Sequence, residues 1–181
     1  MSGLKRSHCA FVVVKLRIEG GDYLLMRRDP DWRDISFLGG HASERDRGKL
    51  ERTARRELLE ELPALRSLAH MDLKPLTEEF TYGPVYSPSA KSQVLYHLRF
   101  FSLVFGENPG PIVESLGTRT PNTLIRQADL SGPSRHKVAA LVGVLAHRID
   151  GGLASLPYSW SKDLGRFCHS PHEHQFELSL E

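Results

Sequence analysis

The feature that most constrains this chain is residues 50–62, which have helical periodicity and carry three carboxylates on one side. Glu57, Glu60 and Glu61 fall at i, i+3 and i+4, so a helix brings all three to one face. The same segment contains an apolar stripe at helical spacing: Ala54, Leu58, Leu62 and Leu65. The acidic arc borders this stripe. We therefore predict a helix that packs one flank on a core, turns its acidic flank toward a cleft and ends at Pro63.

The close spacing of these carboxylates predicts a bound cation. Like charges at i, i+3 and i+4 repel one another and destabilise an isolated helix. A hard divalent cation such as Mg²⁺ takes oxygen ligands and would offset that repulsion. The alternative is a solvated helix face on which the glutamates pair with neighbouring arginines: Arg52, Arg55 and Arg56.

The segments around the predicted helix have the patterns of strands. Residues 9–18 contain a β-branched run followed by alternation, and the hairpin signal at residues 19–22 leads to a returning strand at 23–28. A short strand at 35–38 leads to Gly39 and Gly40. The remaining expectations are strands at 73–82, 93–105 and 123–125, loops at 83–91 and 106–121, and a helix at 138–149 after Pro133-Ser134.

Length and composition indicate one globular domain. The chain has 181 residues, of which 40% are hydrophobic and 25% charged, and its net charge is +2. We expect a loose N-terminus over 1–8, one domain over 9–150, and a C-terminal extension or tail over 151–181. The near-neutral charge identifies no nucleic-acid partner.

The cysteines and the apolar segments indicate the cellular compartment in which the protein is expected. Cys9 and Cys168 lie far apart and form no disulfide framework, which favours a reducing compartment. The N-terminal apolar run is interrupted by Lys15 and lacks a signal-peptide cleavage site. With no apolar run of about 18 residues, no membrane span is expected. We expect a cytoplasmic protein without a membrane partner.

The order strand, hairpin, strand, Gly-Gly and acidic helix resembles the Nudix hydrolase family. Its signature is G-x5-E-x7-R-E-U-x-E-E-x-G-U, where U is a bulky aliphatic residue. The second half is in register here, with residues Arg56, Glu57, Leu58, Glu60 and Glu61. The resemblance is strongest over residues 10–65. It implies an α/β fold, an α/β/α sandwich with a mixed central sheet.

The first half of the signature is altered. Counting back from Arg56, the family's glycine falls at Ala42 and its first glutamate at Gly48. Gly40 lies 16 residues before Arg56, where the family has 14, which indicates a two-residue insertion in the loop. Neither Glu44 nor Glu51 is in register to replace the missing acid, and Pro63 stands where the family has glycine.

The chemistry that this resemblance implies is hydrolysis of a pyrophosphate bond with Mg²⁺ or Mn²⁺. The substrate class is a nucleoside diphosphate linked to another moiety. Glu57 and Glu61 are the expected first metal ligands, and Glu60 is a ligand or orients water. Arg56 is expected to fix the loop or a glutamate through a bidentate contact.

Several further roles are expected around this centre. Gly39 and Gly40 would let the backbone bend sharply beside the metal. Arg27 and Arg28 are candidates for phosphate contact or for edge-strand charges. The general base is not identified, although Glu107 and Glu114 are loop candidates.

Two other functions stay open at this point. The chain could be a Nudix-like nucleotide-binding or sensor module with little or no turnover, which the altered loop favours. It could also be an interaction domain with an acidic helix.

A base could stack on one of three aromatic residues, Phe80, Tyr82 and Trp32, with core packing as the other interpretation. The tail group Cys168, His169, His172 and His174 matches no zinc pattern. The expected partner is a nucleotide-type small molecule, and a homodimer is left open.

Overall fold

The fold is built around a parallel pair of strands, β1 (Lys5–Val13) and β8 (Ser92–Phe105). The computed structural model describes residues 4–29, 34–87, 89–116, 121–130 and 138–165. β5 (Leu38–His41) pairs with β1 in the antiparallel sense. β6 (Met71–Pro75) and β7 (Phe80–Ser87) both pair antiparallel with β8. The central sheet is therefore mixed, as predicted.

A second, antiparallel sheet continues from the first. β2 (Lys15–Ile18) pairs with β3 (Gly21–Arg28) through the predicted hairpin. β4 (Ile35–Ser36) and β9 (Asn122–Arg126) also pair with β3. The chain passes from one sheet to the other at Val14, whose carbonyl oxygen accepts a hydrogen bond from the Leu25 amide.

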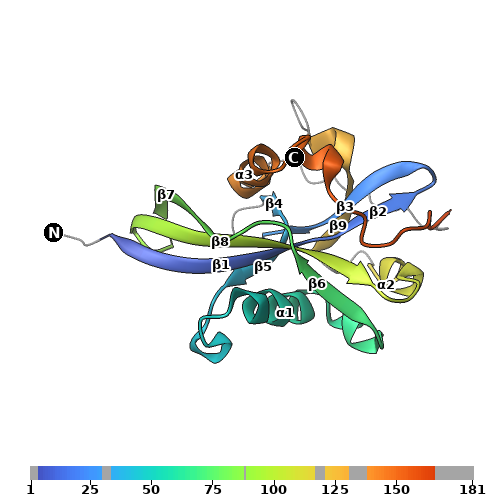
Figure 1. Cartoon of the computed structure of the whole chain (residues 1–181), viewed down its shortest axis with the longest axis horizontal. Coiled ribbons are helices and arrows are strands. Elements are labelled where there is room, and N and C mark those ends of the chain that lie inside the picture. Colours follow the sequence, from blue (N-terminus) through green and yellow to red (C-terminus); the bar gives the residue numbers. More distant parts are fainter. Residues whose placement is uncertain (1–3, 30–33, 88, 117–120, 131–137, 166–181) are drawn as a thin grey trace, which may run out of the picture.

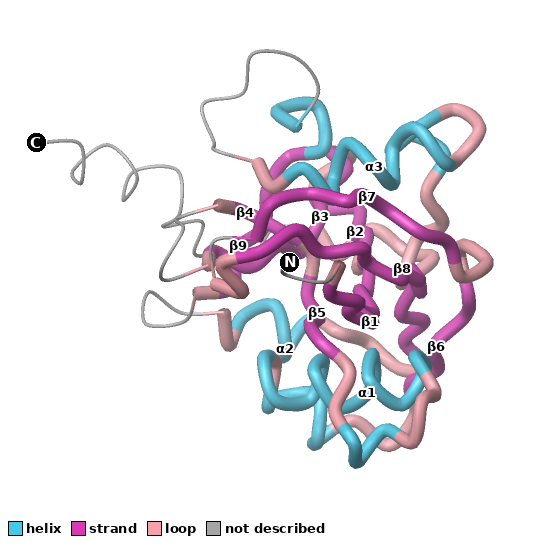
Figure 2. Tube along the Cα trace, turned by 90° about the vertical axis from the view of Figure 1, so that its left-hand side faces the viewer, coloured by secondary structure: helices cyan, strands magenta, loops and turns pink. Residues whose placement is uncertain are grey.

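Helices cover both faces of the central sheet (Figure 1). α1 (Leu50–Glu61) lies on one side and α3 (Ala140–Arg148) on the other, and the turned view in Figure 2 gives the same separation. The short helix α2 (Gly110–Glu114) follows β8. The predicted α/β/α sandwich is thus confirmed. Single 3₁₀ turns occur at Glu44–Asp46, Pro63–Ser67, Gln127–Leu130 and Gly152–Ser155.

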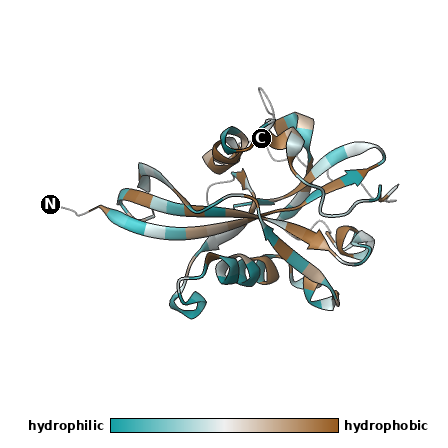
Figure 3. Cartoon of the chain, viewed as in Figure 1, coloured by the Kyte–Doolittle hydropathy of each residue, from teal (hydrophilic) through white to brown (hydrophobic). Residues whose placement is uncertain are grey.

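Alternation along β1 separates two hydrophobic clusters. Ala10 and Val12 point to the side of α1, where they pack with its apolar stripe of Ala54, Leu58, Leu62 and Leu65. The neighbouring residues of β1 point to the other face and pack with α3: Cys9, Phe11 and Val13 against Val142 and Leu145. Figure 3 shows hydrophobic colouring along the strands between the helices, and much of the visible face of α1 is hydrophilic.

Some element boundaries differ from the prediction. The strand expected at 9–18 is two strands, β1 and β2, because the chain changes sheets at Val14. β1 begins at Lys5, where parallel pairing with β8 supplies partners for the backbone. β7 runs through part of the expected loop at 83–91, with an irregularity between Tyr82 and Val85. The expected loop at 106–121 contains α2, whose prolines lie where a first helical turn tolerates them.

Part of the segment predicted as an extension packs on the body of the fold. Leu153 and Leu156 are buried. The Ser159 amide donates to the Lys15 carbonyl, and the Ser159 carbonyl accepts from the Phe105 amide. The Asp163 carboxylate accepts hydrogen bonds from the amides of Glu19 and Gly20. Residues 152–164 therefore cover the β2–β3 hairpin.

Three sequence expectations fall outside the described residues. They concern Trp32, the cap at Pro133-Ser134, and the tail group Cys168, His169, His172 and His174. Within the described ranges, no helix has the length and apolar character needed to cross a membrane.

Candidate active site

The last two turns of α1 present the three predicted carboxylates. Glu57 and Glu61 have side chains 17% and 13% exposed, whereas Glu60 is 55% exposed. The buried stripe of α1 fixes the rotation of the helix, so the adjoining flank carries these side chains to the edge of β5. The helix ends at Glu61, and Pro63 begins the following 3₁₀ turn.

Arg56 links the carboxylates to the loop before α1. Its Nε and Nη2 atoms bind the two oxygens of Asp46 at 3.1 and 3.0 Å. Its Nη1 atom donates to Glu57 at 2.8 Å and to Glu60 at 3.2 Å. Nη2 also reaches the His41 carbonyl oxygen at 2.9 Å. One guanidinium therefore orients two of the three glutamates and fastens the loop to the helix.

Asp46 is the residue that the sequence analysis missed. It is 3% exposed and also accepts hydrogen bonds from Thr53 Oγ1 at 3.1 Å and the Ser43 amide at 2.8 Å. Hydrogen bonding to Arg56 holds the pKa of this carboxyl well below its usual range, and Asp46 raises the pKa of Arg56 in turn. Glu44 and Glu51, considered as replacement acids, are exposed.

A signal for Asp46 is present in the sequence. It lies six residues after Gly40, which is the spacing of the glycine and first glutamate in the signature. With Gly40 and Asp46 in these two positions, the insertion lies between Asp46 and Arg56. Counting back from Arg56 instead placed both positions two residues too late.

Glu61 is held by β3 and β5. Its Oε2 accepts the Gly39 amide at 2.7 Å, and its Oε1 lies 3.1 Å from Arg27 Nε. Burial raises the pKa of Glu61 to about 7, against the lowering effects of the Gly39 amide and Arg27. The Asn122 side chain donates to the Glu61 carbonyl at 2.7 Å, which ties β9 to the end of α1.

The two glycines lie in β5 and are needed for close approach. Gly39 has a φ of +136°, and a Cβ there would lie 2.2 Å from the Ala10 carbonyl oxygen. A Cβ on Gly40 would lie 2.8 Å from the Glu57 carboxylate. Gly39 thus permits β5 to pair with β1, and Gly40 leaves room for the Glu57 side chain.

Comparison with known proteins identifies the family. Residues 6–120 match the family model described as the NUDIX domain, which is more than half of the chain. The chain belongs to the NUDIX family. A search among curated proteins finds no significant match.

The solved structures similar to this NUDIX chain include two of NrtR from Shewanella oneidensis. The first has a TM-score of 0.55 at 14% identity and covers 78% of this chain and 63% of that one. The second, complexed with a 27mer DNA, has a TM-score of 0.53 at 14% identity and covers 77% and 60%. This chain therefore spans about six-tenths of the length of the NrtR chains, and the likeness concerns the fold.

The donor set of this NUDIX chain fits a hard divalent cation. NUDIX enzymes generally use divalent metals. One oxygen of Glu57 and one oxygen of Glu60 accept a hydrogen bond from Arg56. Among the described residues, the second oxygen of each has no hydrogen-bond partner. Carboxylate oxygens of this kind are suited to Mg²⁺ or Mn²⁺. Both oxygens of Glu61 are engaged, so Glu61 is the least available of the three.

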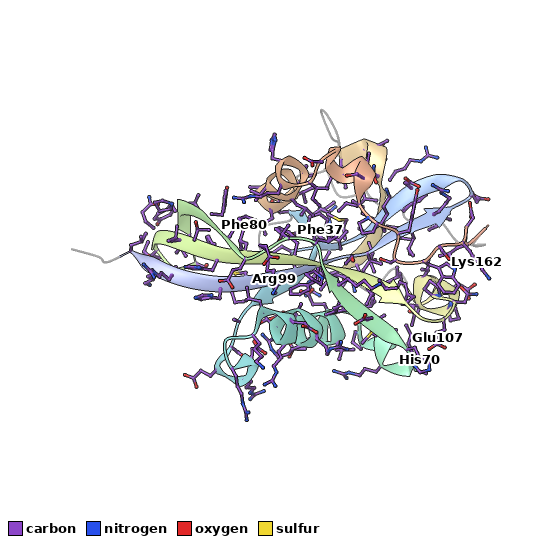
Figure 4. The ribbon with its side chains drawn as sticks, viewed as in Figure 1. Phe37, His70, Phe80, Arg99, Glu107 and Lys162 are labelled. Carbon is purple, nitrogen blue, oxygen red and sulfur yellow. The ribbon has the colours of Figure 1, made fainter. Side chains whose placement is uncertain are left out.

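The other predicted site residues lie apart from this carboxylate cluster or make structural contacts. Arg28 follows Arg27 in β3 and so points to the other face of that strand. Glu107 Oε1 accepts the amides of Ala69 and His70 at 2.5 and 3.3 Å, and Figure 4 shows Glu107 beside His70. Glu114 is exposed on α2. Glu107 therefore fastens a loop.

The aromatic candidates pack against the core. The Phe80 ring stacks on Phe100 with centroids 6.2 Å apart, and Arg148 lies 3.8 Å from its centroid. Phe37 packs edge-on against Phe100, and Figure 4 places Phe37 and Phe80 on the side of the sheet that carries α3. Tyr82 is partly buried against the same cluster.

The Cys9 thiol lies next to the imidazole of His41, at the end of β5. Cys9 Sγ is 3.3 Å from His41 Nδ1, and the Ser7 hydroxyl is 2.7 Å from the same nitrogen. Burial raises the pKa of the Cys9 thiol to about 11, so the thiolate is disfavoured. These contacts position His41, whose carbonyl oxygen binds Arg56.

Proposed function

We propose that this NUDIX protein is a metal-dependent hydrolase that cleaves the pyrophosphate bond of a nucleoside diphosphate linked to another moiety. The observation that supports this proposal most is the set of hydrogen bonds that Arg56 makes with Asp46, Glu57 and Glu60. It orients Glu57 and Glu60 with one oxygen of each left available, beside the partly buried Glu61. Such preorganised oxygens suit a site that must hold a cation against a doubly anionic substrate.

The proposed roles follow from the contacts. Glu57, Glu60 and Glu61 would hold the cation, and Arg56 acts as a positioning residue through its contacts with Asp46 and two of the glutamates. A bound Mg²⁺ or Mn²⁺ would supply charge neutralisation and a more acidic water. Arg27 is proposed to contact a substrate phosphate, after exchanging its ion pair with Glu61 for one with the phosphate.

A binding or sensor module without turnover is the second candidate. The observation that favours it is Glu61, whose two oxygens are already satisfied by Gly39 and Arg27. The likeness of fold to NrtR, one structure of which is complexed with DNA, adds DNA as a partner to test. In this candidate a nucleotide-type ligand binds at the carboxylate cluster and is released unchanged.

Turnover of a substrate panel separates the two candidates. The panel holds nucleotide sugars, dinucleotides and nucleoside triphosphates, each assayed for product with Mg²⁺, with Mn²⁺ and with a chelator. The hydrolase proposal predicts metal-dependent cleavage of at least one member containing a nucleoside diphosphate. Ligand binding by calorimetry without cleavage of any member would reject the hydrolase and support the binding module.

A further inference from the structure

Two histidines and a glutamate meet on the α1 side of the central sheet. His8 of β1 and His97 of β8 are direct neighbours in the parallel pairing. Glu79 lies just before β7, in which Thr81 pairs with His97. Glu79 Oε1 is 3.6 Å from His8 Nδ1 and 3.5 Å from His97 Nδ1. Three segments far apart in the sequence thus bring two ring nitrogens to one carboxylate oxygen.

Hydrogen bonding does not account for this arrangement. Both nitrogen–oxygen separations are at or beyond the longest hydrogen bond. Within the described part of the chain, His97 Nε2 is buried and has no hydrogen-bond partner. Among the described residues, His97 Nδ1 also makes no hydrogen bond, and it faces the Glu79 oxygen 3.5 Å away.

The His8–His97–Glu79 cluster borders a cavity that the loop before α1 also lines. His8 and Glu79 line a cavity of about 330 Å³ together with residues of the 42–50 segment, among them Ser43 and Gly48. The ligand atoms of the three side chains lie within 4.8 Å of one another. A cation held here would have three protein ligands and a fourth position open to the cavity.

We propose that His8, His97 and Glu79 form a second metal site, which takes a first-row transition ion, with Zn²⁺ the best fit. Two imidazoles and one carboxylate are typical zinc ligands, whereas Mg²⁺ prefers oxygen. In a tetrahedral site with bonds of about 2.0–2.1 Å, ligand atoms lie roughly 3.3 Å apart, which is near the two nitrogen–oxygen separations of 3.5 and 3.6 Å.

One side chain has to turn for this site to form. The two rings stack with centroids 4.4 Å apart and planes 14° from parallel, so one ion cannot lie in both planes. The His8 side chain is 51% exposed and that of His97 is 21% exposed, so His8 has more room to turn. Binding would then tie β1 and β8 to the segment before β7, beside the loop that holds Asp46.

Zinc titration of the full chain tests the site. The tail sequence also contains zinc-ligating types, so calorimetry uses the native chain and a full-length parent in which four tail residues are replaced: Cys168→Ser, His169→Gln, His172→Gln and His174→Gln. With Mg²⁺ in large excess to occupy the carboxylates of α1, the parent should bind one equivalent of Zn²⁺, with a higher melting temperature. Glu79→Gln and His8→Gln in this parent should each weaken binding at least tenfold.

Matched controls separate this site from the helix carboxylates. His147→Gln removes an exposed imidazole from α3 and should leave Zn²⁺ affinity unchanged. Glu60→Gln combined with Glu61→Gln should also leave it unchanged, so the result does not depend on the proposed hydrolase. No Zn²⁺ binding by the parent, or equal affinity in the parent, Glu79→Gln and His8→Gln, would overturn the site.

Discussion

At the scale of single residues, Arg56 and Asp46 set the geometry of the carboxylate cluster. Asp46 is buried and accepts hydrogen bonds from the helix, the loop and two guanidinium nitrogens. Without it, Arg56 would keep its contacts with the glutamates but lose its link to the loop. The position of Glu57 and Glu60 therefore depends on a residue that need not touch the substrate.

Asp46→Asn tests this dependence. The substitution removes the charge paired with Arg56, and we expect a loss of about 2–3 kcal/mol of unfolding free energy. The contribution of Asp46 should be present above the usual carboxyl pKa and be lost as pH falls through the lowered folded-state value. Urea unfolding of both proteins at pH 7 and pH 3 measures it. An equal difference at both pH values would contradict the assignment.

Gly40→Ala tests the room left for Glu57. The new Cβ would lie 2.8 Å from the carboxylate, which is the movable end of a side chain, so the fold should survive while the carboxylate is displaced. We expect Mg²⁺ affinity to fall at least tenfold with a small change in melting temperature. Gly48→Ala is the control for a glycine with no atom nearby, although its φ of +69° adds backbone strain. Unchanged Mg²⁺ affinity in Gly40→Ala would contradict this account.

Glu61 gives the metal site a pH dependence. Because burial raises its pKa to about 7, a proton competes with the cation below that pH. Mg²⁺ affinity should rise with pH, by up to about tenfold per unit below pH 7, and level off above it. Without metal, the proton-linked stability is fully present below the usual carboxyl pKa and lost as pH rises through about 7.

Calorimetric Mg²⁺ titration between pH 5.5 and 8.5 measures this effect. Glu61→Gln should bind more weakly and lose most of the pH dependence. A native profile that is flat across this range would show that Glu61 does not exchange a proton when the cation binds.

At the scale of elements, α1 could be predicted and its surroundings only in part. Its apolar stripe and acidic face are encoded at local spacings, and the four stripe residues are all buried. The contacts that position the glutamates come from distant segments: Asp46 in the loop, and Arg27 in β3. Local periodicity holds no information on such tertiary contacts.

The missed elements have equally specific causes. α2 was expected to be a loop because its prolines signal irregular chain, yet proline is accepted in a first helical turn. The single strand expected at 73–82 is two strands, β6 and β7, which both pair with β8. It was expected to end at residue 82 because Gly83 and Pro84 interrupt the alternation, and β7 accommodates them at an irregularity in its pairing with β8. Strand β1 extends to Lys5 because β8 is long enough to pair with it.

At the scale of the whole molecule, the segment after α3 packs on the β2–β3 hairpin and on the end of β8. Residues 152–164 contact β2 and the end of β8, and Tyr158 bonds both Arg17 and Asp22 on the hairpin. The buried Lys15 ammonium donates to the Ala154 carbonyl at 2.9 Å and lies over the Tyr158 ring. The hairpin is therefore stabilised by residues far along the sequence.

Leu156→Ala tests this stabilisation. Leu156 is 2% exposed, and its truncation should cost about 2–4 kcal/mol of unfolding free energy. Ala154→Ser, at an exposed position of the same segment, is the control and should change little. Thermal and urea unfolding measure both. A cost below about 0.5 kcal/mol for Leu156→Ala would mean that this segment is not part of the cooperative fold.

The central claim is that the acidic face of α1 holds the cation needed for turnover. The most direct measurement is the Mg²⁺ dependence of product release, on whichever panel substrate the native chain cleaves. It compares the native chain with two variants. One is the double variant Glu60→Gln plus Glu61→Gln, and the other is Glu51→Gln, at an exposed glutamate in the first turn of the same helix. We predict at least a hundredfold loss of kcat/KM and weaker Mg²⁺ binding in the double variant, and native values in Glu51→Gln. Unchanged metal affinity and activity in the double variant would show that the carboxylate face is only solvated surface.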